Sequence, residues 1–273
     1  MPLTGPSGKG ARTAGWRALI LTDLLVDPTT LMIFMAIGFA AQLVDGALGM
    51  AYGQISSTLL ISMGVPPAAA SAGVHTAETF TTAVSGISHV AHRNVDWRLF
   101  FRIAVPGVIG GVLGAYVLTQ VPADTAKPFV LAYLTILGLY LFYRGVMHRH
   151  TERQPKVVSP LGLVGGFLDA AGGGGWGAIV TSNLLVQGSN PRKTIGTVNT
   201  AEFFLTITIS ATFIAALGWK AFTVATTGLL IGGVVAAPFG AFVAKKVNPD
   251  TLLTFVGALV TLTSGYGLYR ALM

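Results

Sequence analysis

Long apolar blocks separated by short polar breaks run along most of the chain. They cover residues 31–65, 68–90, 99–118, 128–143, 160–186, 194–217, 222–244 and 252–272. Several are about 20 residues long, the length of a helix that crosses the roughly 30 Å hydrocarbon core of a bilayer. A soluble chain of 273 residues could not bury so many helices that are apolar on every side. The pattern therefore predicts an all-α, polytopic membrane protein.

The two halves of the chain align with each other across one long polar linker. A constant offset matches acidic, aromatic and proline positions: Asp45 with Asp169, Glu78 with Glu202, Tyr52 with Trp176, and Pro67 with Pro191. Matches of these residue types rarely arise by chance, so they indicate an internal repeat. We predict two homologous four-segment repeats, 31–148 and 160–273, joined by a linker at 149–159. A tail at 1–30, which lacks the pattern of a cleaved signal peptide, precedes them.

The first block of each repeat is interrupted by glycine. The stretches 45–49 and 169–175 lie in the middle of these blocks, and the second contains four consecutive glycines, Gly172–Gly175. Such a run disfavours helix, and non-helical backbone at membrane depth needs cover from protein or a water-filled cavity. Each first block is therefore expected to be broken, either as one discontinuous crossing or as a re-entrant hairpin. A kinked but continuous helix is the alternative.

The positions of Lys and Arg discriminate between these topologies. Hairpins leave three full crossings in each half and place most basic residues on one side of the membrane: Arg93, Arg98, Arg102, the stretch 144–156, Arg192, Lys193, Lys245 and Lys246. Lys9, Arg12 and Arg17 in the tail disagree. Eight full crossings would instead divide the cluster between the two sides. The charge pattern therefore favours inverted repeats.

Composition narrows the choice of function. The chain is 52% hydrophobic and 10% charged, with a formal net charge of +7 and no cysteine. Because Lys and Arg lie at the ends of apolar blocks, this charge indicates membrane orientation, and we expect no nucleic-acid partner. Disulfides, thiolate metal sites and cysteine nucleophiles are excluded. No histidine and carboxylate spacing suggests a metal site, so neither a metal nor a cofactor is expected.

Four acidic residues lie inside apolar blocks: Asp45, Glu78, Asp169 and Glu202. A charged group at the bilayer centre costs about 2.5–3.5 kcal/mol even on the lenient insertion scale, so it usually faces a cavity and marks a function. Asp45 and Asp169 adjoin the breaks and are assigned a structural role there, because each could cap the half-helix that follows. Glu78 and Glu202 are assigned to proton coupling or gating. His75, which could titrate near neutral pH, joins them, although a neutral hydrogen-bonded histidine fits equally well.

Polar residues also follow the breaks. A half-helix that starts after a glycine loop presents unpaired N–H groups and a positive dipole end, which together can bind an anion. Ser and Thr could instead bond to carbonyls of their own helix. The candidate substrate-binding residues are Tyr52, Gln54, Ser56, Ser57, Thr76, Gly173, Gly174, Gly175, Trp176, Asn199 and Thr200.

Several local motifs carry a family resemblance. In the first half they are Leu43-Val44-Asp45-Gly46 with Gly49 and Gly53, the spacing to Pro66-Pro67, and Asn94-Val95-Asp96-Trp97-Arg98; in the second half they are Phe167-Leu168-Asp169-Ala170 with Gly172–Gly175, and Gly196-Thr197. The chain resembles the TauE/SafE sulfite exporter family, also called the toluenesulfonate uptake permease family. The resemblance implies transport of sulfite, sulfoacetate or other sulfonates across the bacterial cytoplasmic membrane. One departure is that the first break reads Gly46-Ala47-Leu48-Gly49, so the two half-sites are expected to be unequal.

These observations favour a secondary transporter that alternates access around an anion site between the halves. Acidic residues beside an anionic substrate are tolerable if they are protonated at that depth. A passive anion channel on the same scaffold is the alternative. An intramembrane enzyme would need a nucleophile with a base or a metal cluster, and the sequence offers neither. The expected partners are a small anionic substrate and the lipid bilayer, with homo-oligomer formation left open.

Overall fold

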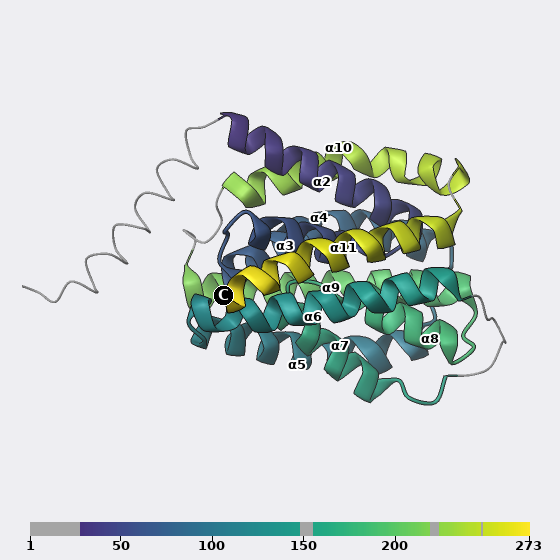
Figure 1. Cartoon of the computed structure of the whole chain (residues 1–273). Helices are drawn as coiled ribbons and strands as arrows, with labels where there is room; N and C mark the ends of the chain where they lie inside the picture. The colour runs from purple at the N-terminus through teal and green to yellow at the C-terminus, as the bar shows by residue number, and fades with distance from the viewer. Residues whose placement is uncertain (1–27, 148–154, 219–223, 247) are drawn as a thin grey trace, which may run out of the picture.

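The structure, a computed structural model, describes residues 28–147, 155–218, 224–246 and 248–273. Every regular element in these ranges is helical, and the helices run roughly along one common axis (Figure 1). The elements are α2 (Pro28–Leu48), α3 (Tyr52–Ser62), α4 (Pro67–Ala91), α5 (Trp97–Gln120), α6 (Ala123–Val146), α7 (Ser159–Gly172), the π-helical turn η1 (Gly177–Thr181), α8 (Ser182–Val186), α9 (Pro191–Leu217), α10 (Val224–Lys246) and α11 (Pro249–Leu272). The predicted tail lies almost wholly outside the described residues, as does part of the linker.

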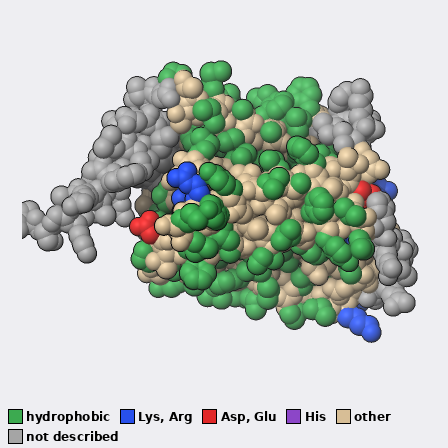
Figure 2. All heavy atoms as spheres, viewed as in Figure 1, with side chains coloured by type: hydrophobic (Ala, Val, Ile, Leu, Met, Phe, Trp, Pro, Cys, Tyr) green, Lys and Arg blue, Asp and Glu red, His purple; other side chains and the backbone are tan. Residues whose placement is uncertain are grey.

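Five helices are long and apolar enough to cross a membrane, namely α2, α5, α6, α9 and α11 within the described ranges. Their outward faces expose large apolar side chains, including Phe129 at 72% and Leu262 at 73% of their area. Hydrophobic side chains accordingly cover much of the visible surface (Figure 2). A soluble monomer rarely exposes so much contiguous apolar surface. The prediction of an all-α, multi-pass membrane protein is confirmed.

Helix boundaries follow the turn signals in the sequence. Asp96 begins α5 by accepting hydrogen bonds from the backbone N–H groups of Arg98 (3.0 Å) and Leu99 (3.1 Å). Asn190 caps α9 and Asn248 caps α11 in the same way, each followed by a proline in the first turn. These side chains satisfy N–H groups that a helix start leaves without a partner.

The first broken block doubles back on itself. α2 runs parallel to α10, since Gly228 lies against Leu31 and Phe34 while Phe39 contacts Phe239 further along both helices. α4 also runs parallel to α10, since Gly73 lies against Thr226 and Thr81 against Gly233 further along both helices. The chain turns from α3 into α4 within four residues at 63–66. α3 is therefore antiparallel to both α2 and α4.

The second broken block is also a hairpin. α7 runs parallel to α5, since Gly162 lies against Ile103 and Phe167 against Gly114 further along both helices. The residue that follows α8, Gln187, returns to the start of α7. Its Oε1 accepts hydrogen bonds from the backbone N–H groups of Lys156 and Val157, both at 2.9 Å. Neither a single discontinuous crossing nor a kinked continuous helix describes these blocks.

The main helix contacts join opposite halves of the chain. α2 packs along α10 at one edge of the bundle, α5 along α7 at the other, and α6 along α11 (Figure 1). α4 and α9 pack against each other between them. Glycine permits this closeness: a Cβ on Gly114 would lie 2.3 Å from the carbonyl oxygen of Phe167. α4 and α9 thus lie at the centre of the bundle, although each keeps an exposed apolar face, with Ile87 of α4 and Phe204 of α9 as examples.

Candidate functional site

The two breaks meet in the interior of the protein. A Cβ added to Gly53 would lie 2.7 Å from the Cα of Gly174, and one added to Gly174 would lie 2.4 Å from the carbonyl carbon of Gly53. Glu78, beside this contact, follows the start of α4 by three turns, about 16 Å of helix. That is roughly half the thickness of a 30 Å hydrocarbon core. The hairpin tips therefore touch near mid-depth.

Glycine allows the second break its shape. Gly173, Gly174 and Gly175 have φ values of 78°, 140° and 151°, conformations that other residues rarely adopt. Each is buried among side chains or backbone of other elements. The first break uses Gly49 at 67° but also a strained Ala51 at 96°. The two breaks therefore differ in backbone as well as in sequence.

An aspartate side chain caps the returning half-helix in each hairpin. Oδ1 of Asp169, which is only 2% exposed, accepts a hydrogen bond from the N–H of Trp176 at 2.8 Å. Oδ1 of Asp45 accepts one from the N–H of Tyr52 at 3.4 Å. A carboxylate here is favoured by the unpaired N–H groups and by the positive end of the helix dipole. Each aspartate thus occupies the kind of position that a bound oxyanion would take.

His75 and Asp169 form a buried pair, with Nε2 of the imidazole 3.0 Å from Oδ2 of the carboxyl group. Nδ1 of His75 lies 2.7 Å from the backbone oxygen of Ser71, which can only accept a hydrogen bond. The Ser71 hydroxyl donates to the oxygen of Ala170 at 2.7 Å, so its hydrogen is not available to the imidazole. Nδ1 must therefore carry a hydrogen.

This geometry fixes the proton count of the pair. With Nδ1 protonated, the contact between Nε2 and Oδ2 needs one more proton, on either the imidazole or the carboxyl group. The pair of His75 and Asp169 is neutral overall in both cases and holds one exchangeable proton. At the equivalent place beside the first break stands Asn199, whose Nδ2 donates to the hydroxyl of Ser85 at 3.3 Å. An amide does not titrate, so the two sites differ chemically.

Side chains from three elements bind the carbonyl groups that the second break leaves open. The hydroxyl of Ser57 on α3 donates to the oxygen of Gly173, and that of Tyr133 on α6 donates to the oxygen of Gly174 at 3.0 Å. Ser71 on α4 does the same for Ala170. Sequence reasoning did not single out Tyr133 or Ser71. A tyrosine hydroxyl in an apolar block was the available signal, because such a group needs a buried partner.

The four membrane-depth carboxyl groups are brought together around these breaks. Glu78 lies within electrostatic range of Glu202, Asp169 and Asp45, and Glu202 lies within range of both aspartates. Glu78 is 6% exposed, and its Oε2 has no hydrogen-bond partner. A buried ionised oxygen without a partner is costly, so this geometry fits a protonated carboxyl group.

The aromatic candidates Tyr52 and Trp176 present their backbone N–H groups to the breaks, whereas their side chains point elsewhere. The hydroxyl of Tyr52 donates to the oxygen of Leu229 at 3.1 Å, and Nε1 of Trp176 donates to the oxygen of Val198 at 3.2 Å. Both rings therefore pack against neighbouring helices, while the backbone N–H groups of the two residues stay at the breaks. Gln54 and Ser56 are buried on α3, and the Ser56 hydroxyl has no partner.

The threonine candidates lie along the contact between α4 and α9. Thr76 donates to the oxygen of Ala72 at 2.8 Å, and Thr200 donates to the oxygen of Gly196 at 2.7 Å. Both hydroxyls thus bond within their own helix, the alternative stated for such residues. Thr200 borders an apolar groove on the outside of α4 and α5. The structure does not bring it to the hairpin tips.

Comparison with known proteins gives consistent results. The family described as Sulfite exporter TauE/SafE matches residues 34–267. A protein from Bacillus subtilis (strain 168), named probable membrane transporter protein YtnM, is 42% identical over 243 residues, which are 86% of this chain and 81% of that protein. No solved structure matches the chain. Family and relative both indicate membrane transport rather than catalysis.

Proposed function

Because the chain belongs to the sulfite exporter TauE/SafE family, we propose that it is a secondary transporter for a small sulfur-containing oxyanion. Sulfite, or an organosulfonate such as sulfoacetate, would be moved across the bacterial cytoplasmic membrane. The observation that carries this proposal is the contact between the two hairpin tips near mid-depth, where N–H groups at half-helix starts face carboxyl groups. Secondary transporters often bind substrate at such interrupted helices between repeats.

We further propose that α2–α6 and α7–α11 are inverted repeats. The sequence alignment of the halves supports this, and so does the exchange of partners: α2 packs on α10, while its counterpart α7 packs on α5, the counterpart of α10. The first hairpin opens toward one end of the bundle and the second toward the other (Figure 1). Rocking of one half against the other would then open the site to each side in turn.

The distribution of charge supports an orientation for this arrangement. Most Lys and Arg side chains that the structure describes belong to one end of the bundle, where α4 ends and α5, α7, α9 and α11 begin: Arg93, Arg98, Arg102, Arg144, Lys156, Arg192 and Lys193. The opposite end has Lys127 and Arg270. By the positive-inside rule the first end faces the cytoplasm, and the second hairpin opens there.

The aspartate caps suggest how an anion and a proton would be coupled. While Asp169 is ionised, it holds the N–H of Trp176 and so competes with an oxyanion for that donor. A proton placed on Asp169 weakens this hydrogen bond and frees the half-helix start for an oxyanion. His75 shares that proton through its contact with Oδ2. Glu78 and Glu202 would accept or release further protons as the halves move.

Flux measurements in liposomes test this function. Purified protein should take up sulfite faster when a proton gradient is imposed, and the rate should saturate with concentration. The inhibition of sulfite uptake by excess sulfate, thiosulfate or small sulfonates would rank these compounds as substrates. Flux that stays linear with concentration and ignores the proton gradient would instead support a passive channel.

Carboxyl variants test the coupling. Glu78→Gln and Glu202→Gln should each weaken the response of sulfite flux to pH, because each removes a titratable group near the breaks. Asp124→Asn is the matched control, since Asp124 is exposed in the first turn of α6. If both glutamine variants keep the wild-type pH response, the assigned coupling role is wrong.

A further inference from the structure

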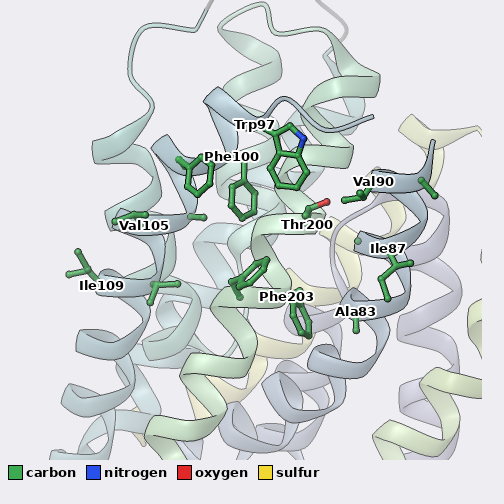
Figure 3. Close-up of a pocket in the computed structure, with 15 residues that line it drawn as sticks. Ala83, Ile87, Val90, Trp97, Phe100, Val105, Ile109, Thr200 and Phe203 are labelled. Atoms are coloured by element: carbon green, nitrogen blue, oxygen red, sulfur yellow. The ribbon is translucent and has the colours of Figure 1, made fainter. Parts of the chain in front are cut away.

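An apolar groove of about 870 Å³ opens on the side of the bundle between α4 and α5. Ile87 and Val90 form one wall, Val105 and Ile109 the other, and Phe203 of α9 lies at the floor (Figure 3). Thr200 is the one lining residue besides tryptophan with a polar side-chain atom, and its hydroxyl already bonds to Gly196. The volume lies within the roughly 300–1,000 Å³ of small-ligand pockets.

The walls of the groove belong to the surface that faces lipid. Ile87 is 71% exposed, Val105 55% and Ile109 53%. α4 and α5 are joined only by the short loop 92–96, yet they diverge enough to leave α9 accessible between them. The groove therefore opens sideways into the hydrocarbon core, and an acyl chain is the natural occupant there.

Basic side chains stand at one end of the groove. Val90 and Trp97 mark that end (Figure 3), and the loop between them carries the exposed Arg93. Arg98 is exposed on α5 and lies two turns before Val105 and three before Ile109, hence on the same face of the helix.

These arginines remain available to a ligand. Asp96, the nearest acidic residue in sequence, uses Oδ1 to cap α5. In the part of the chain that the structure describes, no carboxylate forms a salt bridge with Arg98 or with its exposed neighbour Arg102. Trp97 is half exposed beside them, in the position of an aromatic residue at a membrane interface.

We propose that this groove binds one anionic phospholipid. Its acyl chain would lie along α9 between α4 and α5, and its phosphate would contact Arg98 and Arg102. Moving a chain from lipid into an apolar groove gains little, because both surroundings are equally apolar. Selection must therefore come from the headgroup, which basic residues at the cytoplasmic interface attract.

A second copy of the chain fits the groove less well. Copies related by a two-fold axis along the membrane normal would meet through the same face. Arg98 and Arg102 of one copy would then approach those of the other at the same depth, and like charges repel. An anionic lipid headgroup is instead attracted by these arginines.

Native mass spectrometry of delipidated protein tests the proposal. Phosphatidylglycerol should bind with one-to-one stoichiometry and more tightly than phosphatidylcholine with the same chains. Arg98→Gln with Arg102→Gln should weaken phosphatidylglycerol binding about 25-fold, roughly fivefold for each arginine, and leave phosphatidylcholine unchanged. The control Arg270→Gln removes a charge at the opposite end of the bundle and should have no effect.

A second variant tests the chain-binding part independently. Ala83→Phe fills the groove near its inner end and should weaken both lipids, whereas Val164→Phe on the exposed face of α7 should weaken neither. Three outcomes would each overturn the proposal. The two lipids could bind equally, Arg270→Gln could weaken binding as much as the double arginine variant does, or Ala83→Phe could leave binding unchanged. A dimer that Ala83→Phe dissociates would also overturn it, because the groove would then hold a second copy. If Ala83→Phe fails to fold, the exposed arginine variants still decide the outcome.

Discussion

The contact between the two hairpin tips can be tested by adding a single methyl group. In Gly53→Ala the new Cβ would lie 2.7 Å from the Cα of Gly174, closer than real Cβ atoms approach another carbon. The neighbouring backbone cannot easily retreat, because Tyr133 holds the oxygen of Gly174 and Ser57 holds that of Gly173. The substitution should therefore push the two halves apart at the site itself.

Two opposing effects set the size of the change. Alanine is better than glycine inside a helix by roughly 0.5–1 kcal/mol, which favours the variant. Overpacking a tightly packed contact typically costs about 1–3 kcal/mol, which opposes it. Gly265→Ala isolates the first effect: Gly265 lies within α11, and its Cβ would meet the nearest atom, Cγ2 of Thr135, at an ordinary 3.7 Å. The two variants should therefore differ in unfolding free energy by about 1–3 kcal/mol.

Thermal unfolding in detergent and sulfite flux in liposomes measure the two consequences. Gly265→Ala should melt at or above the wild-type temperature and transport normally. Gly53→Ala should melt below it and lose most flux, even at a temperature where it remains folded. If Gly53→Ala matched Gly265→Ala in both assays, the tips would not be in the contact described, and the site would have to lie elsewhere.

Three further changes concern the second break. His75→Asn removes the shared proton, so flux should persist but vary much less over a pH series; an unchanged profile would contradict the proton count of the pair. Asp169→Asn leaves the buried imidazole without its carboxyl partner and should lower the free energy of unfolding by about 3–5 kcal/mol. The double variant with His75→Asn should cost less than the sum of the two single changes. Tyr133→Phe leaves the oxygen of Gly174 without its donor and should cost about 1–3 kcal/mol, whereas Tyr266→Phe, at a residue 64% exposed, should cost almost nothing.

Hydrophobic length and turn residues were sufficient to locate the helices. Each predicted block corresponds to one long helix or to one broken hairpin, and the proline and asparagine signals begin α4, α9 and α11. The glycine runs predicted the breaks because a stretch such as Gly172–Gly175 disfavours helix at several successive positions. These features are local, so the sequence around each of them contains the necessary information.

The parts that could not be predicted depend on contacts between distant segments. Nothing near Tyr133 in sequence shows that its hydroxyl meets Gly174, and nothing near His75 shows that it meets Asp169. The position of Trp176 beside the glycines suggested a substrate contact, yet its ring packs on α9 and only its N–H faces the break. Which side chains converge is decided by how α4, α6 and α7 pack, and periodicity does not specify that.

The two hairpins differ chemically, and this difference assigns them different steps of the proposed transport cycle. Asp169 is held at 2.8 Å from its N–H partner and shares a proton with His75, while Asp45 lies at 3.4 Å from its partner and has an amide, Asn199, in the equivalent position. The cap of the second hairpin has an adjacent side chain that can share a proton with it, whereas the cap of the first hairpin has an amide there. The second hairpin is therefore the better candidate for the proton-coupled step, and the first for a step that depends on substrate alone. Exchanging the two residues, as His75→Asn with Asn199→His, should move the pH dependence from one side of the membrane to the other, which flux measured with pH changed on one side at a time would detect.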